Sequence, residues 1–506
     1  MKKLKIISII TASVFVLNLS LYAKDGYYLL KAGIHFDSNV SGGKYSLNEL
    51  AKIITKEKLD VAIITDHDNM DVSYGIKPFQ DLLKITISRN SVRKYGFENY
   101  FSYINYLDRI YNNTIFIPGI EAVPFYYWTG NPLDKNLILN GWHTHLLIFG
   151  ISSVEYYKKL PSLYNNNFYD NYNGNTLKYI SNNFNYFLKL FFYFTIALLL
   201  LFYVIKKIYL KRKVHGVRSP ALSTVFFIIV CILIITEYPF KPKKYTQYSN
   251  DPGTGPYQYL IDYVNKYGGL VFWAHPEVTH EETLPLNIPF MQNQIKISTE
   301  AYPDLVYQTK NHSGFAIFWE GMKTLGRPGG LWDMALKEYC LGLRKKPFWV
   351  IGELDFEESN NLDLLHETNT FIFAKEFSQE GVIEAMRKGR MYATRSYFGD
   401  LIEINDFSIH DPYTNTSAFI GETLILTYPE ARIHIKIKLK KNISKPINIF
   451  LFRGTQLIKE MIFDKPVDVW IEDINLPSEK KFYYKIYIGT KDWISVATNP
   501  IFVIKQ

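Results

Sequence analysis

The sequence predicts an α/β domain that is interrupted by an apolar hairpin and followed by an all-β domain. Residues 28–65 run from an apolar strand through a helix to a second apolar strand, which is a βαβ pattern. Two apolar segments, Phe187–Ile205 and about Ala221–Thr236, flank a basic loop in the middle of the chain. Beyond about Leu401, apolar and polar residues alternate strictly, as they do in antiparallel sheets with one buried face.

Both strands of the βαβ unit end in side chains that can bind metals or transfer protons. His35 and Asp37 stand at the end of the first strand, and Asp66-His67-Asp68 follows the second, Leu59–Thr65. The second run is too short and too rich in β-branched residues for a helix. Because the carboxyl ends of parallel strands meet at one edge of a sheet, we expect these groups to lie together there.

The helix between these strands is marked by its first turn. Ser46 and Glu49 stand three residues apart after the pair Gly42-Gly43, and this is the spacing of a capping box. Each side chain then satisfies a backbone N–H that the first helical turn leaves free. The apolar positions share one helix face and are Leu47, Leu50, Ile53 and Ile54.

Further elements follow along the chain. We expect a helical stretch over Tyr74–Asn113, a strand over Thr114–Ile120 and a strand that ends at Ala274. Ser378–Lys388 has the pattern of a capped helix. The clearest alternating run is Arg432–Leu439, with every second residue apolar.

Length, charge and cysteine content limit the class of protein. A chain of 506 residues suggests more than one domain. The net charge of +9 is spread along the chain, which fits an anionic surface or a phosphate-bearing substrate, and no nucleic-acid partner is expected. The two cysteines, Cys231 and Cys340, predict neither an intradomain disulfide nor a thiolate zinc site.

Two parts of the chain indicate a membrane protein. Residues 1–25 have a basic start and an apolar run, the layout of a secretory signal peptide or of an uncleaved anchor. Phe187–Ile205 has nineteen residues and one charge, Lys189, and is long enough to cross a bilayer. The loop Lys206–Arg218 carries six Lys or Arg and no acid, so we expect it in the cytoplasm and both flanking halves outside it. Two buried helices of a soluble protein are the alternative, although such helices rarely stay apolar all round.

The stretch 35–68 resembles the opening motif of the polymerase-and-histidinol-phosphatase (PHP) family of metal-dependent phosphoesterases. That pattern is H-x-H, a Ser/Gly turn, a helix, a strand and D-H. Here His35-Phe-Asp37 replaces the second imidazole by a carboxylate, and Asp66-His67 matches D-H. Four later elements are similar to the family's and come in its order: Pro118-Gly-Ile-Glu121, His145-Leu-Leu, Ala274-His275-Pro276 and Asp355-Phe-Glu357.

Other segments are similar to the carbaryl-hydrolase-like branch of this family, which includes carbamate hydrolysis. They are Leu331-Trp-Asp333, the segment from Gly381 to Ala393, and the segment from Thr498 to Val503. The resemblance covers about residues 28–150 and 255–503.

The resemblance implies a fold and a domain order. The fold would be a distorted TIM-like (β/α)7 barrel of PHP type, interrupted by a transmembrane helical hairpin and followed by an antiparallel β-sandwich. The predicted parts are the signal segment 1–25, the first barrel part 26–157, a linker 158–186, the hairpin 187–238, the second barrel part 239–400 and the sandwich 401–506.

The resemblance also implies a metal cluster. Two divalent ions that share a water lower its pKa and hold the attacking and leaving oxygens of a phosphoester. Glu121 would bridge the two ions. The remaining ligands would be His35, Asp37 and Asp355 for one ion, and His145 and His275 for the other.

A third ion, held by His67 and Glu357, is left open, because no histidine follows Asp37 where trinuclear members have one. The predicted catalytic residues are His67, Asp66 and Asp355. Asp37 and Glu357 place carboxylates where the family has imidazoles. Carboxylates favour harder ions, so we expect the affinity for Mn or Fe to rise relative to that for Zn.

Several residues carry weaker predictions. His143 is an alternative to His145, since both fall on one strand face, and Asp66 and Asp68 are either ligands or acceptors that orient His67. Arg390 and Arg395 could bind a substrate phosphate. We expect His280 and His312 to be exposed, and Lys436 and Lys438 to lie on a solvated sheet face.

The leading interpretation is a membrane-anchored, metal-dependent hydrolase of a small phosphoester, with its catalytic domain extracytoplasmic. The alternatives are a hydrolase of carbamates or amides and a catalytically silent module that binds anionic ligands.

Overall fold

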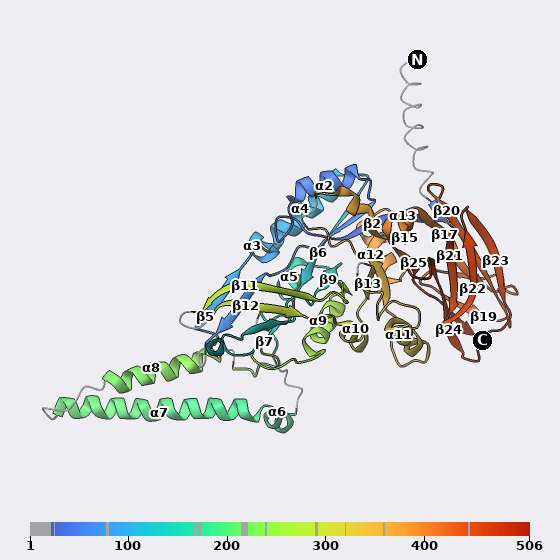
Figure 1. Cartoon of the computed structure of the whole chain (residues 1–506). Coiled ribbons are helices and arrows are strands. Elements are labelled where there is room, and N and C mark those ends of the chain that lie inside the picture. The colour runs from blue at the N-terminus through green and yellow to red at the C-terminus, as the bar shows by residue number, and fades with distance from the viewer. Residues whose placement is uncertain are drawn as a thin grey trace, which may run out of the picture.

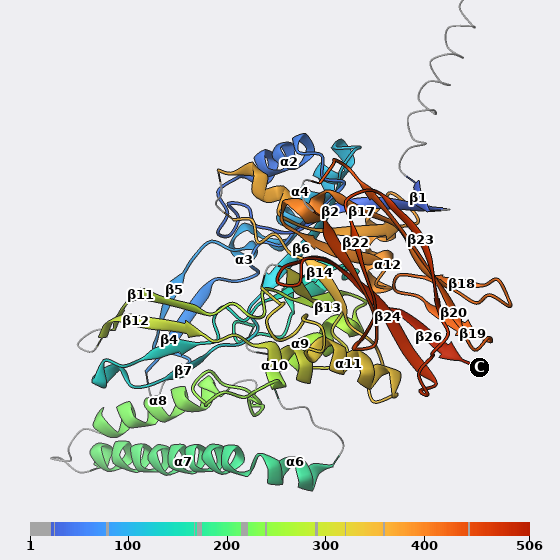
Figure 2. The same ribbon diagram turned by 45° about the vertical axis from the view of Figure 1, so that its right-hand side comes forward.

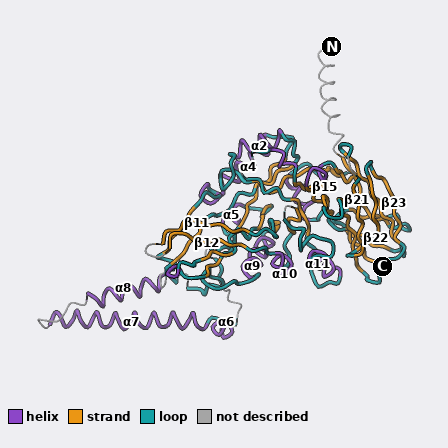
Figure 3. The backbone as a smooth tube through the Cα atoms, in the orientation of Figure 1, coloured by secondary structure: helices purple, strands orange, loops and turns teal. Residues whose placement is uncertain are grey.

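The computed structural model of this chain is a mixed α/β structure built on one large sheet (Figures 1 and 3). It describes residues 22–24, 26–76, 80–165, 167–169, 175–213, 221–237, 240–288, 292–318, 320–357, 360–443 and 446–506. Within these residues the largest sheet has 16 strands, most of them in the order β14-β13-β10-β9-β6-β3-β2-β15-β16-β25-β24-β21-β22. The predicted signal segment lies almost wholly outside the described residues.

The first seven strands of this order form a ring around the larger hydrophobic core. Their bounds are β2 (Tyr27–Phe36), β3 (Val61–Ile64), β6 (Ile115–Ala122), β9 (Leu146–Phe149), β10 (Leu270–Trp273), β13 (Gly314–Phe318) and β14 (Trp349–Gly352). The chain after β14 closes the ring on β2, because Leu354 N donates to Ile34 O at 2.9 Å and Phe356 N donates to His35 O at 3.1 Å. The predicted strands therefore come together as a TIM-like ring.

One strand of the ring runs against its neighbours. β9 pairs antiparallel with both β6 and β10, whereas the other strand pairs of the ring are parallel. The residue just before β9 consequently lies at the same edge as residues that follow the parallel strands. This reversal is what brings His145 to the edge where the other predicted ligands are found.

Helices cover the outside of the ring (Figure 1). They are α2 (Leu47–Lys56), α3 (Val92–Tyr95), α4 (Phe97–Ile110), α5 (Val154–Lys158), α9 (Gly255–Lys266), α10 (Pro303–Gln308), α11 (Leu331–Cys340) and α12 (Gln379–Arg387), with 3-10 turns at Pro132–Asp134 and Leu362–His366. The predicted capping box of α2 is confirmed: Ser46 accepts from the N–H of Glu49, and the Glu49 carboxylate accepts from the N–H of Ser46. The predicted cap of α12 at Ser378 is confirmed as well.

The prediction that Tyr74–Asn113 is helical throughout is wrong for its first part. There β4 (Asp71–Gly75) pairs antiparallel with β5 (Lys84–Ser88), and helix begins only at Val92. The sequence Lys84-Ile-Thr-Ile-Ser88 alternates with period two and is rich in β-branched residues, which explains why it extends rather than coils.

A second, smaller sheet lies beside the ring (Figure 2). Its order is β11-β12-β8-β7, with bounds β7 (Tyr127–Thr129), β8 (Ile138–Asn140), β11 (His280–Ile288) and β12 (Gln292–Thr299). Segments on both sides of the apolar hairpin contribute to it. Apolar residues of this sheet and of adjoining segments, with Trp128 and Trp142 among them, pack into a core of their own.

The apolar hairpin leaves the body of the protein between β9 and β10 (Figures 1 and 2). It consists of α7 (Phe184–Lys213) and α8 (Ala221–Thr236), preceded by the short α6 (Thr176–Asn182). By length and composition one described helix, Phe184–Lys211, is able to cross a membrane, and only 17% of its apolar window is buried. Lys189, the single charge of the predicted span, forms an ion pair with Glu237 beyond the end of α8.

The C-terminal strands form two layers around a second core. One layer continues the ring sheet through β15 (Thr368–Ala374), β16 (Met391–Arg395), β25 (Ile494–Thr498), β24 (Lys481–Gly489), β21 (Ile447–Arg453) and β22 (Gln456–Phe463). The other is β18 (Ser417–Phe419), β17 (Ile402–His410), β20 (Ala431–Leu439) and β23 (Val467–Asp473). The remaining elements are β1 (Tyr22–Lys24), β19 (Thr423–Leu426), β26 (Ile501–Lys505) and α13 (Ser396–Asp400).

The second core explains the alternating run of the sequence. Ile433, Ile435 and Ile437 of β20 are buried, while the residues between them are exposed or half-buried. One layer is continuous with the ring, however, so these strands are joined to the barrel by a shared sheet rather than by a linker.

A buried ion pair fixes the ring to the C-terminal layer. Asp333 of α11 lies 2.5 Å from the Lys485 ammonium of β24, and it also accepts from the Tyr483 hydroxyl at 2.7 Å and from Gly329 N at 2.7 Å. Lys485 donates in addition to the Tyr487 hydroxyl at 2.9 Å. Both charges are almost completely buried, so each depends on the other for its stabilisation.

We therefore expect Asp333→Asn to lower the free energy of unfolding by roughly 3–5 kcal/mol, because it leaves the Lys485 ammonium buried without a counter-charge. Thermal unfolding of the full chain in detergent measures the effect. Asp492→Asn, at an exposed position of the loop before β25, is the matched control and should unfold at the wild-type temperature. Equal unfolding temperatures for the two variants would show that the pair does not hold the layers together.

Candidate metal centre

The ends of five ring strands and the start of β9 deliver the predicted ligands to one edge of the ring. β2 carries His35 at its end, β6 carries Glu121, and β9 begins just after His145. His67 follows β3 and His275 follows β10. The segment after β14 adds Glu353, Asp355 and Glu357. All eight predicted metal-ligand positions therefore lie at the same edge.

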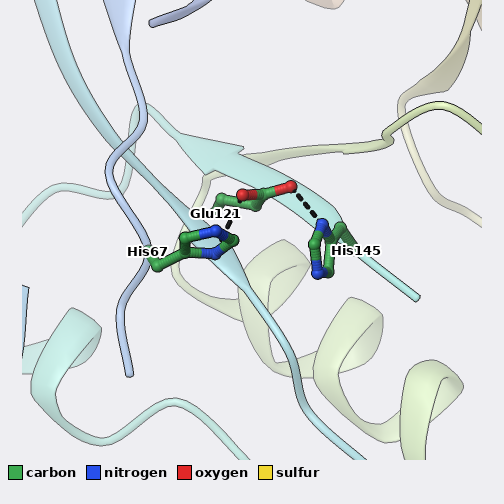
Figure 4. Close-up of side chains that lie close together, drawn as sticks. All are labelled: His67, Glu121 and His145. Atoms are coloured by element: carbon green, nitrogen blue, oxygen red, sulfur yellow. Dashed lines mark ion pairs between the residues drawn. The ribbon is translucent and has the colours of Figure 1, made fainter. Parts of the chain in front are cut away.

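Glu121 stands at the centre of the cluster, between imidazoles on both sides (Figure 4). Its Oε1 lies 2.5 Å from His145 Nδ1 and 3.5 Å from His275 Nε2. Its Oε2 lies 2.9 Å from His67 Nδ1 and 3.3 Å from His35 Nε2. Each carboxylate oxygen thus faces its own pair of imidazoles, which is the arrangement expected of a carboxylate that bridges two ions.

The carboxylates at the other side of His35 extend the cluster. His35 Nε2 lies 3.6 Å from Asp37 Oδ2, and His35 Nδ1 lies 3.6 Å from Asp355 Oδ1. Possible ligand atoms of Asp37, Asp355 and Glu357 lie within 4.8 Å of one another. His35 and Asp37 are fully buried, whereas Glu357 is exposed.

Glu353 is a functional residue that the sequence analysis did not single out. Its Oε1 lies 2.5 Å from His35 Nδ1, and its Oε2 accepts from the backbone N–H of His275 at 2.7 Å. With its Nδ1–H accepted by Glu353, His35 would offer the lone pair of Nε2 to a cation beside Glu121 and Asp37. Its place two residues before Asp355, directly after a strand, was the signal that could have identified it.

Tyr302 is a second residue of this kind. Its hydroxyl donates to Ala274 O at 2.6 Å and accepts from His145 N at 3.4 Å, so it joins the two segments that present His145 and His275.

Three of the predicted ligands have a backbone conformation that L-residues rarely adopt. The φ angles are +74° at His35, +23° at His275 and +50° at Asp355. Such conformations cost about 1–3 kcal/mol each and persist where the surrounding structure requires them. Their concentration at strand ends around one carboxylate marks this edge as a site selected for geometry rather than for stability.

Four buried polar atoms of this cluster have no hydrogen bond among the described residues. His35 Nε2, Asp37 Oδ2, His67 Nδ1 and Glu121 Oε1 are buried and have no hydrogen-bond partner within the described part of the chain. The ion-pair partners of Glu121 among the described residues are all imidazoles. Imidazole nitrogens and carboxylate oxygens that converge without a hydrogen bond between them are ligand atoms that suit a divalent cation.

The pKa shifts have the same cause. Burial lowers the pKa of His67, but the carboxylates of Glu121, Asp37 and Glu357 together outweigh burial and raise it to about 10. Burial likewise opposes the nearby carboxylates at His275, which raise its pKa to about 9. Burial would raise the pKa of Glu121, yet the neighbouring imidazoles hold it well below its usual range. Without cations, protons on His67 and His275 supply positive charge beside this carboxylate, whereas burial lowers the pKa of His145 to about 4.

Asp66 and Asp68 do not enter this cluster. Asp66 accepts from the backbone N–H and hydroxyl groups of Ser38 and Ser41, at 2.7–3.1 Å, and so shapes the turn after Asp37. Its oxygens are thereby engaged away from Glu121, and its predicted catalytic role remains a prediction. Burial raises the pKa of Asp68 to about 7, and Asp68 N donates to Glu121 O at 2.9 Å.

The weaker predictions meet different outcomes. His145 contacts Glu121, whereas His143 lies in a separate group with His280, which is half-buried rather than exposed. His312 was expected to be exposed and is buried, because its ring nitrogens lie 3.0 and 3.2 Å from two backbone carbonyls.

Arg390 and Arg395 do not line the site. Arg390 is buried against Tyr27 and pairs with Glu384, and Arg395 stacks on Trp493 with its centre 3.8 Å from the ring centroid. The phosphate-binding prediction for these two residues is therefore wrong in this structure.

A cavity of about 590 Å³ opens over the cluster. His67, Glu121, His145, His275, Asp355 and Glu357 line it. Arg89, which no sequence pattern singled out, supplies an arginine to the same lining, and Met70, Val278, Leu354 and Leu364 supply apolar surface. The cavity thus combines a possible metal centre with one guanidinium and an apolar wall.

No family model matches the chain, and no curated protein matches it. Among solved structures, the chain is similar to a two-domain protein from Bacteroides vulgatus that contains a predicted PHP-like metal-dependent phosphoesterase, with 13% identity over 94% of this chain and 96% of that one and a TM-score of 0.34. It is also similar to an amidohydrolase from Chromobacterium violaceum, with 12% identity over 65% of this chain and 88% of that one and a TM-score of 0.24. These likenesses are too distant to transfer a function, so the case for one rests on the residues of the site.

We expect metal binding to release protons and to tighten as pH rises. Nearby carboxylates raise the pKa of His275 to about 9, so this predicted ligand is protonated in the cation-free protein at pH 7.5, whereas a metal ligand must be neutral. Affinity for Mn²⁺ should therefore climb from pH 6 to 9 and level off near pH 10. Calorimetry in two buffers of different ionisation enthalpy measures the protons released. Binding with the same heat in both buffers would contradict this assignment.

Proposed function

We propose that the protein is a metal-dependent hydrolase of the PHP type whose substrate is a small phosphoester. The observation that carries the proposal is the position of Glu121, whose two oxygens each face a separate pair of imidazoles. A structural carboxylate would be satisfied by hydrogen-bond donors, whereas Glu121 Oε1 and two of the facing nitrogens have no hydrogen bond among the described residues.

The residues divide into two sets around this carboxylate. His145 and His275 would hold one cation, and His35 with Asp37 and Asp355 would hold the other. Bound divalent cations would supply the positive charge that polarises a phosphoester and lowers the pKa of water. Two carboxylates where imidazoles were expected, Asp37 and Glu357, favour Mn or Fe over Zn in this centre.

Other side chains of the cavity would orient the substrate and move its protons. Arg89 can hold a phosphate through paired N–H groups. His67 lines the cavity and is the group placed to give a proton to the leaving oxygen, whereas Asp355 would act through the cation that it holds. Because Asp66 is engaged by the turn at Ser38, we assign it the positioning of the Asp37 loop.

The carbaryl-hydrolase-like branch supplies the second candidate. The apolar wall of Met70, Val278, Leu354 and Leu364 would suit the aryl part of a carbamate, which the phosphoester proposal does not require. An aryl carbamate is therefore the substrate to assay beside a phosphodiester.

We also propose that the α7–α8 hairpin anchors the enzyme in a membrane. Large apolar side chains are exposed along α7, with Phe191, Leu198, Leu199 and Phe202 each more than 60% accessible. The ring requires strands from both sides of the hairpin, so residues before and after it must lie on one face of the bilayer. The basic loop at the far end favours an extracytoplasmic catalytic domain.

If this proposal holds, His275→Ala and Asp355→Asn should each lower turnover of bis(p-nitrophenyl) phosphate by at least a hundredfold, because each removes a ligand that the cation needs. Turnover is measured with full-length protein loaded with Mn²⁺, together with the metal content of each variant.

Glu353→Gln provides an internal control for positioning. It should weaken metal binding roughly 10–100-fold and recover turnover in excess Mn²⁺, since Glu353 orients His35 without being a ligand. Hydrolysis of an aryl carbamate alone would select the second candidate. A wild-type protein that binds two cations and turns over neither substrate would be a silent binding module.

The topology is tested by thiol labelling of intact cells, in a chain whose Cys231 and Cys340 are replaced by serine. Tyr413→Cys, 79% exposed in the C-terminal layer, should react with an impermeant maleimide from outside. Ser219→Cys, directly after the basic loop and outside the described residues, should react only after lysis. Labelling of both positions from outside, or of neither, would refute an extracytoplasmic domain anchored by this hairpin.

A further inference from the structure

A second group of possible ligands lies in the same cavity but outside the cluster around Glu121. It consists of His143, His280 and Glu282. His143 Nε2 lies 3.6 Å from Glu282 Oε1, and His280 Nε2 lies 3.9 Å from Glu282 Oε2. The two imidazole rings lie 3.8 Å apart between centroids. These side chains are 21–39% exposed, so the group is nearer to solvent than the inner cluster.

The fold places these three residues through the small sheet. His280 and Glu282 are two residues apart on β11 and therefore project from the same face. Thr299 of β12 pairs with His280 in the ladder, and its hydroxyl also accepts the backbone N–H of His143 at 3.0 Å. One residue thus fixes both the strand that carries His280 and the loop that carries His143.

One polar atom of each of the three residues is buried and has no hydrogen bond in the part of the chain that the structure describes, although the three side chains converge. His143 Nε2, His280 Nε2 and Glu282 Oε1 are each buried and have no hydrogen-bond partner in the described residues. Separations of 3.6–3.9 Å are too long for hydrogen bonds. They suit a shared cation, because zinc ligands stand about 2.0–2.2 Å from the ion and hence roughly 3.4 Å from one another in a tetrahedral site.

We propose that His143, His280 and Glu282 hold a further divalent cation, separate from those of the Glu121 cluster. Two imidazoles and one carboxylate form a donor set that zinc accepts with a coordination position left for water or substrate. The ring of His143 lies 5.6 Å from that of His145, so this cation would stand beside the inner centre in the shared cavity. The proposal does not depend on the inner centre being active.

The test is the zinc content of the full-length protein, stripped with a chelator and reloaded with zinc. Glu282→Gln should bind one zinc per chain fewer than the wild type. Glu281→Gln is the matched control, since Glu281 projects from the other face of β11 and pairs with Lys296 at 2.7 Å. It should bind as many zinc ions as the wild type. Equal zinc content in Glu282→Gln and Glu281→Gln would overturn the proposal.

Two further measurements separate this site from the inner centre and from a folding defect. Glu121→Gln should lose inner zinc and retain the outer ion, and loss of all zinc by this folded variant would count against an independent site. In the wild type, zinc should protect His280 from diethylpyrocarbonate, as read by mass spectrometry of its peptide. Modification of His280 at the same rate with and without zinc would also overturn the proposal.

Discussion

A single buried carboxylate, that of Glu121, sets the requirements for the rest of the structure. A charge with so little access to water must be compensated locally, and the compensation comes from four imidazoles on four different segments. Those segments can reach Glu121 only if the ends of β2, β3 and β10 and the start of β9 meet at one edge. The need to bring four imidazoles to Glu121 explains three features of the structure. They are the reversal of β9, the strained backbone at His35 and His275, and the position of the Glu353 carboxylate behind them.

The insertion of the hairpin is compatible with that requirement because it enters and leaves at nearly the same place. β9 and β10 are neighbours in the ring, so an antiparallel pair of helices between them leaves the ring closed. The chain returning from α8 packs back on the body, where Trp128 N donates to Gln247 O and Gly75 N donates to the Tyr248 hydroxyl. A membrane anchor of this kind would fix the orientation of the cavity toward the bilayer without taking part in the site.

Local sequence patterns predicted what local physics controls. The Ser46–Glu49 capping box, the strand after Leu59 and the alternation of β20 each depend on neighbours a few residues away, and all three are present. The helical prediction was wrong for the part of the chain that contains β5. The period-two alternation that favours a strand there covers only five residues, which is a weak signal within a long polar stretch. His312 was expected to be exposed because no local sequence pattern indicates that the backbone carbonyls of Val306 and Gly314 lie next to its ring nitrogens.

The sequence by itself determined which side chains stand at the ends of the strands, because strand ends and ligand residues are both local features. The tertiary structure alone decided which of them meet. Glu353 and Tyr302 belong to the site because they bond to segments far away in the chain, those of His275 and Ala274. Arg390 and Arg395 lie away from the cavity because they pack on Tyr27 and Trp493. His280 and Glu282 lie next to His143 because β11 pairs with β12, whose Thr299 hydroxyl binds the loop before β9. Long-range pairing has no signature in the residues on either side, so such contacts follow from the closed ring and its covering sheet alone.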